Sequence, residues 1–116
     1  MGATLEERIR FTQELIDVVP TPLFYKDLGG RYIGCNRAYE QALHPLSLIL
    51  GQKSCDFAPP AQAKLCEAED RRLLEAPDQT RVYECSITFR DDSLHDVVIF
   101  KSVFRSAAGV RPASWP

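Results

Sequence analysis

The sequence predicts a single α+β domain with an antiparallel sheet, and three observations support this prediction. The chain has 116 residues, which is enough for one hydrophobic core but not for two. Apolar and polar residues alternate from Arg81 to Phe89, the pattern of a strand with one buried face. Apolar spacing over 5–19 and strong helix formers over 61–75 predict two helices. Helices and hairpin-forming strands in separate runs are typical of α+β domains.

The composition is that of a globular protein and argues against several kinds of partner. Apolar residues make up 45% and charged residues 26%, and the formal net charge is −2. Acidic and basic residues are interleaved, so we expect no basic surface for nucleic acid. No apolar segment approaches the roughly 18 residues of a membrane span. We therefore expect a cytoplasmic domain without a membrane segment.

Residues 1–19 are expected to form an amphipathic helix that ends before Pro20. Thr4 and Glu7 have the spacing of a capping box, which satisfies free backbone N–H groups at a helix start. The apolar face needs a cover, either this domain or a second copy across a dimer, and the sequence leaves both open. The candidate dimer residues on this face are Leu5, Ile9, Thr12, Leu15 and Ile16.

A short hairpin and a capped helix follow. Strands are predicted over 23–26 and 31–35, joined by the turn 27–30, whose two glycines tolerate the positive φ of tight turns. Asn36 is placed to cap a helix over 37–43, and we interpret it as a cap rather than a catalytic residue. Residues 45–58 are predicted as a loop with a short helical turn over 46–50.

The helix predicted over 61–75 has two carboxylates on its apolar face. Leu65, Cys66 and Leu73 define that face, and Glu69 and Asp70 interrupt it. An isolated charge on a buried face is costly. A cationic partner for one of these carboxylates is therefore expected.

The next segment predicts a long hairpin, 81–89 and 94–104, around the turn 91–93. Pairing symmetric about Asp92 places Lys101 on the inner face of the sheet, whereas Val98 and Phe100 lie on the outer face and are further dimer candidates. The predicted cross-strand pairs are Ile87 with Val97, Cys85 with Ile99, and Tyr83 with Lys101.

Neither a metal site nor catalysis is predicted. The cysteines are widely spaced without a CxxC motif, and His44 and His95 lie outside metal-ligand spacing. Neither histidine is placed to activate a buried cysteine, and no phosphate loop or GxSxG motif is present. Reduced thiols used as small core residues are the favoured interpretation of Cys35, Cys55, Cys66 and Cys85.

Four phrases, ELIDVVPTPLFYKDLGGRYIGCNRAYEQA, LGQKSCDFAPP, AEDRRLLEA and YECSITF, give the chain a family resemblance. From about Glu14 to Gly109 it resembles a PAS domain, a sensor module of bacterial histidine kinases and diguanylate cyclases. The resemblance implies a five-stranded antiparallel sheet in the order 2-1-5-4-3, with helices on one face enclosing a small cavity. The PAS domain is expected over 20–110, and 111–116 would be a tail or linker toward an output domain outside this chain. The residues that match the family best are Asp27, Gly30, Arg31, Tyr32, Asn36, Ala38 and Tyr39.

The resemblance also argues against two cofactors. Flavin-binding light sensors of the family carry a Gly-x-Asn-Cys-Arg-Phe-Leu-Gln segment. This chain has Cys55 one residue late in the corresponding stretch from Gly51, and it lacks the Asn, Arg and Gln. Haem-binding members use a histidine on the long helix, and 61–76 contains none. No cofactor is predicted.

The strand parity of the family implies a cavity with two inward lysines, Lys26 and Lys101, and a helix carboxylate. In one account Asp70 or Glu69 pairs with a lysine. In the other, a lysine and the Tyr83 hydroxyl bind the carboxylate of a small apolar acid. The predicted cavity residues are Phe24, Lys26, Ile33, Cys35, Tyr39, Phe57, Leu65, Asp70, Leu73, Tyr83, Cys85, Ile87, Val97, Ile99 and Lys101.

The resemblance favours two functions. One is a ligand-responsive sensor, in which cavity occupancy biases an output domain. The alternative is a ligand-free interaction module that mediates homodimerisation. The ending from Val110 to Pro116 departs from the usual last strand of the family, because its prolines cannot donate to a sheet ladder. The fifth strand is expected to be short, displaced or completed by a neighbouring chain.

Overall fold

The computed structural model describes residues 4–103, 105–106 and 109–110. Up to residue 101 the elements follow the predicted order, with one helix, α4, inside the segment predicted as a loop. The predicted tail 111–116 lies outside the described residues. The elements are α1 (Leu5–Asp17), β1 (Phe24–Lys26), β2 (Tyr32–Cys35), α2 (Arg37–Ala42), α3 (Leu46–Ile49), α4 (Ser54–Phe57), α5 (Pro60–Glu75), β3 (Arg81–Thr88), β4 (Leu94–Lys101), β5 (Arg105–Ser106) and β6 (Gly109–Val110).

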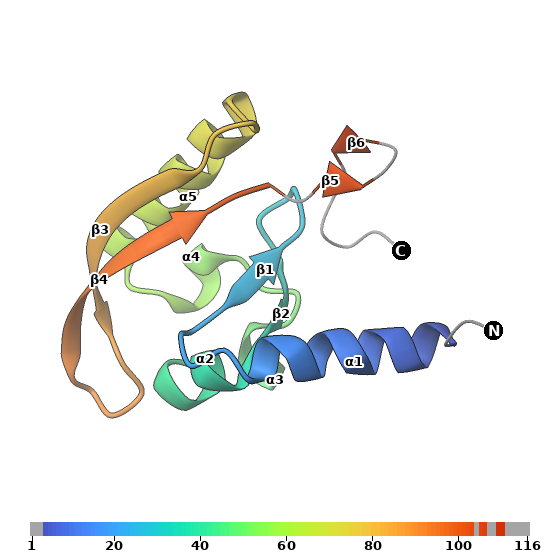
Figure 1. Ribbon diagram of the computed structural model, residues 1–116. Coiled ribbons are helices and arrows are strands. Elements are labelled where there is room, and N and C mark those ends of the chain that lie inside the picture. Colours follow the sequence, from blue (N-terminus) through green and yellow to red (C-terminus); the bar gives the residue numbers. More distant parts are fainter. Residues whose placement is uncertain (1–3, 104, 107–108, 111–116) are drawn as a thin grey trace.

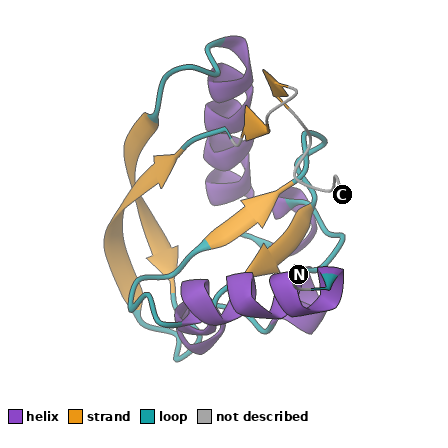
Figure 2. Cartoon of the chain, turned by 45° about the vertical axis from the view of Figure 1, so that its right-hand side comes forward, coloured by secondary structure: helices purple, strands orange, loops and turns teal. Residues whose placement is uncertain are grey.

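The strands form antiparallel pairs. Within the described ranges β1 pairs with β2, β3 with β4, and β5 with β6, as three two-stranded sheets. The five-stranded order therefore stays a prediction. α5 lies behind the β3–β4 hairpin, and α1 lies below β1 and β2 (Figure 1). Figure 2 shows from another side that α1 runs along the β1–β2 hairpin.

The predicted register of the β3–β4 hairpin is wrong by two residues. Tyr83 faces Ile99, Cys85 faces Val97, and Ile87 faces His95, whereas Lys101 faces Arg81. The turn is centred on Asp91 instead of Asp92, because the Phe89 N–H bonds to the Ser93 carbonyl and only three residues lie between them. Asp92 takes the left-handed conformation (φ 69°) that a three-residue hairpin loop requires. A shift of two residues preserves the faces, so the predicted inner residues remain inner.

The core lies between the first hairpin and the short helices. Its buried residues, from β2, α2 and α3, pack with side chains from β1, α3 and α4 and with Leu43, which follows α2. Aromatic rings dominate the centre, where Phe24 packs against Tyr32 and Tyr39 with centroids 5.3 and 5.8 Å away. This core cluster consists of Tyr32, Cys35, Tyr39 and Ile49, with Phe24, Leu43, Leu46 and Phe57 packed around them, and Ala63 and Leu73 of α5 are also buried.

Asn36 connects α1, β1 and α2, and it is fully buried. Its Oδ1 accepts hydrogen bonds from Tyr39 N, which caps α2, and from Leu23 N. The predicted cap is thereby confirmed, and the same side chain also binds the segment before β1. Its Nδ2 donates to three backbone carbonyls that precede β1, those of Ile16, Val19 and Thr21.

The apolar face of α1 is largely open. The predicted capping box of Thr4 and Glu7 is present, but α1 has no buried residue. The described residues also leave the outer face of the hairpin open, because Phe100 is 71% exposed and Val98 is 52% exposed. No helix in the described part of the chain is long and apolar enough to cross a membrane.

Candidate functional site

A buried ion-pair cluster joins β1, β4 and α5. Lys26 Nζ lies 2.8 Å from Asp70 Oδ2, and Lys101 Nζ lies 2.7 Å from Asp70 Oδ1. The lysine side chains are only 9% and 8% exposed, and the Asp70 side chain is 24% exposed. The expected pairing of a helix carboxylate with a lysine is confirmed, with both lysines on one carboxylate.

Cys66 lies directly beside this cluster, one helical turn before Asp70. Its Sγ lies 3.2 Å from Lys26 Nζ and 3.1 Å from Lys101 Nζ, and the Ser54 hydroxyl donates to it at 3.3 Å. The sequence marked Cys66 only as part of an apolar face and did not mark Ser54. The i, i+4 spacing of Cys66 and Asp70 was the signal that could have placed both on the lysines.

The charges of the cluster shift several pKa values. Burial opposes ionisation of Asp70, but the two ammonium groups lower the pKa of its carboxyl. Burial also disfavours the charged lysines, yet the partners of Lys26 and Lys101 raise the pKa of both. Burial opposes a Cys66 thiolate, and the two ammonium groups outweigh it, so the pKa of this thiol is lowered. Two ammonium groups against one carboxylate leave one positive charge unbalanced.

The second carboxylate of α5 has a structural role. Glu69 is 3% exposed and accepts from Arg81 Nε at 2.8 Å and from Arg72 at 3.1 Å. The hydrogen bond from Arg81 is the main reason that the pKa of Glu69 is lowered. These contacts fix α5 to the start of β3 and leave Asp70 to the lysines.

A cavity of about 50 Å³ adjoins the cluster between α5, the first hairpin and β3. Cys66, Ser54 and Tyr83 line it on the side next to the lysines, and His44 and Gln62 are further polar lining residues. Eight predicted cavity residues line it: Phe24, Tyr39, Phe57, Leu65, Tyr83, Cys85, Ile87 and Ile99. The others, which are outside the lining, are Lys26, Ile33, Cys35, Asp70, Leu73, Val97 and Lys101.

The Tyr83 hydroxyl is buried and makes no hydrogen bond to any described residue. Burial is the main cause that raises the pKa of this phenol. The Lys101 ammonium group lies 5.3 Å from the centre of its ring. A neutral hydroxyl in the cavity wall can donate to an acceptor or accept from a donor. The Tyr32 hydroxyl differs, because it is bonded to Ser54 at 3.2 Å.

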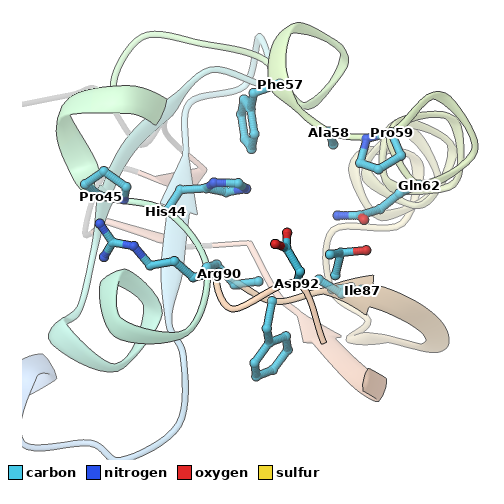
Figure 3. Close-up of a pocket in the computed structure, with 12 residues that line it drawn as sticks. His44, Pro45, Phe57, Ala58, Pro59, Gln62, Ile87, Arg90 and Asp92 are labelled. Carbon is cyan, nitrogen blue, oxygen red and sulfur yellow. The ribbon is translucent and has the colours of Figure 1, made fainter. Parts of the chain in front are cut away.

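A wider cleft of about 270 Å³ opens outside the cavity. In Figure 3 the His44 ring and the Asp92 carboxylate point into this cleft, with Gln62 across from His44. The sequence did not mark Gln62 or assign His44 to a site. The cleft and the cavity share six lining residues, Leu43, His44, Phe57, Ala58, Gln62 and Ile87, so the cleft adjoins the cavity.

No group of three or more potential metal ligands occurs in the ranges that the structure covers. From the sequence we expect neither a metal site nor a cofactor, and both expectations remain predictions.

Comparison with known proteins identifies the family. The PAS fold matches residues 16–109, most of the chain, and the chain belongs to this family. The sequence has no significant match among curated proteins. PAS domains are signal-sensing modules of signalling proteins.

Solved structures share the fold at low identity. The Vibrio cholerae VqmA dimer, solved in the absence of its target DNA, is similar over 96% of this chain with 22% identity and a TM-score of 0.67. VqmA bound to DPO is 21% identical over 92% of this chain and 54% of its own, with a TM-score of 0.65. The PAS domain of Bordetella pertussis BvgS is 21% identical over 91% of this chain and 80% of its own, also with a TM-score of 0.65. This chain spans about half of VqmA, 48% in the dimer structure.

Proposed function

We propose that this PAS domain is the sensor of a bacterial signalling protein and binds a small organic acid in its cavity. The observation that carries the proposal is the buried Tyr83 hydroxyl, which lines the cavity and lacks a partner among described residues. A buried hydroxyl without a hydrogen bond costs about 1 to 3 kcal/mol. A ligand oxygen at this position would recover that free energy.

The charge of the neighbouring cluster supports an anion. Lys26 and Lys101 share the single carboxylate of Asp70, which leaves one unbalanced positive charge behind the Cys66 wall of the cavity. A carboxylate placed against Tyr83 and Cys66 would lie within the field of both ammonium groups. This arrangement differs from the direct lysine contact expected from the sequence, because the lysines are outside the lining.

The size of the cavity limits the ligand. A cavity needs roughly 10 to 15 Å³ for one water on the same measure, so about 50 Å³ admits only a few heavy atoms. A short-chain carboxylic acid fits this limit, with its apolar end toward Leu65, Ile87 and Ile99. Entry would follow the outer cleft past His44 and Gln62.

Signal relay requires that the ligand favours one of two arrangements. Gln13 of α1 donates to the Cys35 carbonyl at 3.0 Å, and buried Asn36 bonds to the Ile16 carbonyl at 3.0 Å. The hairpin that walls the cavity is thereby bonded to α1. A ligand that moves this hairpin would move α1 and so bias an output domain outside this chain. We assign the domain a binding role rather than a catalytic one.

Calorimetric titration with the series acetate to hexanoate tests the proposal. We expect saturable binding of at least one acid by the wild type. Tyr83→Phe should weaken it by about tenfold or more, since hydrogen bonds to charged groups contribute about 1.5 to 3 kcal/mol. This variant removes a buried unpaired hydroxyl, so the fold should be retained. Cys55→Ser, at an exposed position outside the cavity lining, is the control. Absence of binding across the series, or equal affinity in Tyr83→Phe, would reject the proposal.

Homodimerisation is the second candidate function, and the open apolar faces favour it. Ile9 and Leu15 of α1 are 61% and 53% exposed, and Phe100 on the outer sheet face is 71% exposed. Exposed apolar surface of this kind marks interaction sites. Light scattering on wild type, Ile9→Glu and Phe100→Glu tests this role. A dimer that dissociates in one variant identifies the seam, whereas a wild-type monomer at high concentration rejects the role.

We also infer that one more strand lies between β1 and β4, as the five-stranded order expected from the sequence requires. Lys26 of β1 and Lys101 of β4 both contact Asp70, yet no ladder joins these strands among the described residues. Amide hydrogen exchange tests the inference. Protection of the β4 amides that point away from β3 would support it, and fast exchange there would contradict it.

A further inference from the structure

We propose that Cys66 is a modification site, at which a hydroperoxide converts the thiolate to a sulfenic acid inside the cluster of Lys26, Lys101 and Ser54. The proposal goes beyond ligand sensing and does not depend on the proposed acid. It concerns the sulfur atom that lines the cavity and contacts both ammonium groups.

The surroundings of Cys66 are built to hold a negative sulfur. Two ammonium groups and one hydroxyl lie 3.1 to 3.3 Å from Sγ, each with a hydrogen to donate. A thiolate there would also neutralise the positive charge that Asp70 leaves unbalanced. The pKa of the thiol is lowered accordingly, with the ammonium groups outweighing burial. Thiolates beside lysines are the reactive form of cysteine.

The cavity supplies space and a second polar group for the oxidant. Its volume of about 50 Å³ exceeds the roughly 10 to 15 Å³ that one water needs, so hydrogen peroxide fits. The unpartnered Tyr83 hydroxyl lines the same cavity as Cys66 and can donate to a peroxide oxygen. The outer cleft shares the side chains of Gln62 and His44 with the cavity, so movement of these two side chains would admit the peroxide from solvent.

The reaction is a two-electron oxidation of sulfur by the peroxide. The Cys66 thiolate attacks one peroxide oxygen, an S–O bond forms, and the O–O bond breaks. The other oxygen leaves as hydroxide, having received the electron pair of the broken bond, and takes a proton from solvent to become water. The product is the sulfenic acid, whose oxygen lies near Ser54 and the ammonium groups. A thiol reductant returns it to the thiol.

The other three cysteines lack these surroundings. Cys35 is buried, and burial raises the pKa of its thiol to about 11. Burial also raises the pKa of Cys85. Cys55 is exposed, but a hydrogen bond to Glu67 raises the pKa of its thiol. If exposure alone determined reactivity, Cys55 would react fastest. If the charged surroundings determine it, Cys66 reacts fastest.

Site-resolved labelling of the reduced wild-type chain tests the proposal. The chain is treated with hydrogen peroxide and dimedone, which traps sulfenic acids, and each cysteine is followed by peptide mass spectrometry. A lowered pKa increases the thiolate fraction more than it reduces the nucleophilicity of the sulfur. We expect labelling at Cys66 to be severalfold faster than at the other cysteines.

Variants extend the test. Cys66→Ser should abolish the fast labelling. Cys55→Ser, the exposed control, should leave the labelling rate of Cys66 unchanged. The wild-type map is decisive even if a variant fails to fold. Fastest labelling at Cys55, or no dimedone adduct at Cys66, would overturn the proposal. Binding of acids by calorimetry is a separate readout, so failure of one proposal is distinguishable from failure of the other.

Discussion

Replacement of Asp70 by asparagine should destabilise the domain more than any surface substitution. The change preserves the shape of the side chain and removes its charge. Lys26 and Lys101, whose side chains are 9% and 8% exposed, would then retain two buried ammonium groups without a carboxylate. They would also repel each other. Breaking a buried ion pair by removal of one partner typically costs 3 to 5 kcal/mol.

Two features of the site set the expected size of the effect. Two ammonium groups lose a partner at 2.8 and 2.7 Å, which favours the upper end of that range. Asp70 itself is 24% exposed, so water can reach the cluster and reduce the cost. We expect a loss of about 3 to 4 kcal/mol, a large fraction of the 5 to 15 kcal/mol typical of a domain. Removal of a carboxylate charge at an exposed position should reduce the free energy of unfolding far less.

Urea unfolding at neutral pH is the assay. With an m-value of about 1.5 kcal/mol/M, the midpoint should fall by about 2 M or more. Asp96→Asn is the matched control, because Asp96 is exposed on β4 and bonds only to the Ser86 hydroxyl among described residues. Its effect should stay within about 0.5 kcal/mol. An Asp70→Asn midpoint equal to that of the control would refute the reasoning, since the ion pairs would then contribute nothing.

Three further predictions follow from other contacts. Asn36→Ala should cost about 3 kcal/mol in urea unfolding, because it removes the α2 cap and leaves buried backbone groups unpaired; a loss below 1 kcal/mol contradicts this. Gly34→Ala places a Cβ against the Tyr25 ring, so it should lower the free energy of unfolding of the wild type. The same substitution should lower it little in a Tyr25→Ala background, and a double-mutant cycle measures this difference. Because the pKa of Asp70 is lowered, its carboxylate stabilises the fold at pH values above the usual pKa of a carboxyl group. This stability is lost as the pH falls through the lowered pKa. The Asp70→Asn variant should therefore lose less stability on acidification, and equal acid titrations of the two proteins would argue against the assignment.

Local signals in the sequence predicted most of the fold. The capping box of Thr4 and Glu7 and the Asn36 cap depend on residues three apart, and both are present. The inner face of β3 followed from alternation alone. The register did not, because it depends on how Asp92 closes the loop: the pairing is symmetric about Asp91, whereas symmetry about Asp92 was predicted from the sequence.

The site depended on contacts between distant segments, and the sequence predicted it only in part. An ion pair between a lysine and a carboxylate of α5 was expected from the cost of a buried charge. The position of Cys66 between both lysines requires that β1 and β4 meet over the same helical turn, which no local pattern encodes. α4 was missed because its four residues, Ser54–Phe57, are too few for periodicity to show.

The single unbalanced charge of the cluster connects the two proposals and yields a prediction that depends on both. A bound carboxylate and a Cys66 thiolate would each neutralise the same positive charge, so each should disfavour the other. Such coupling is reciprocal at equilibrium. A saturating acid from the series acetate to hexanoate should therefore raise the pKa of Cys66 and slow its labelling by peroxide and dimedone severalfold, with exposed Cys55 as the internal control. Competition for the same 50 Å³ cavity acts in the same direction. An acid that binds by calorimetry yet leaves the Cys66 rate unchanged would show that the ligand lies elsewhere, most plainly in the outer cleft beside His44 and Asp92.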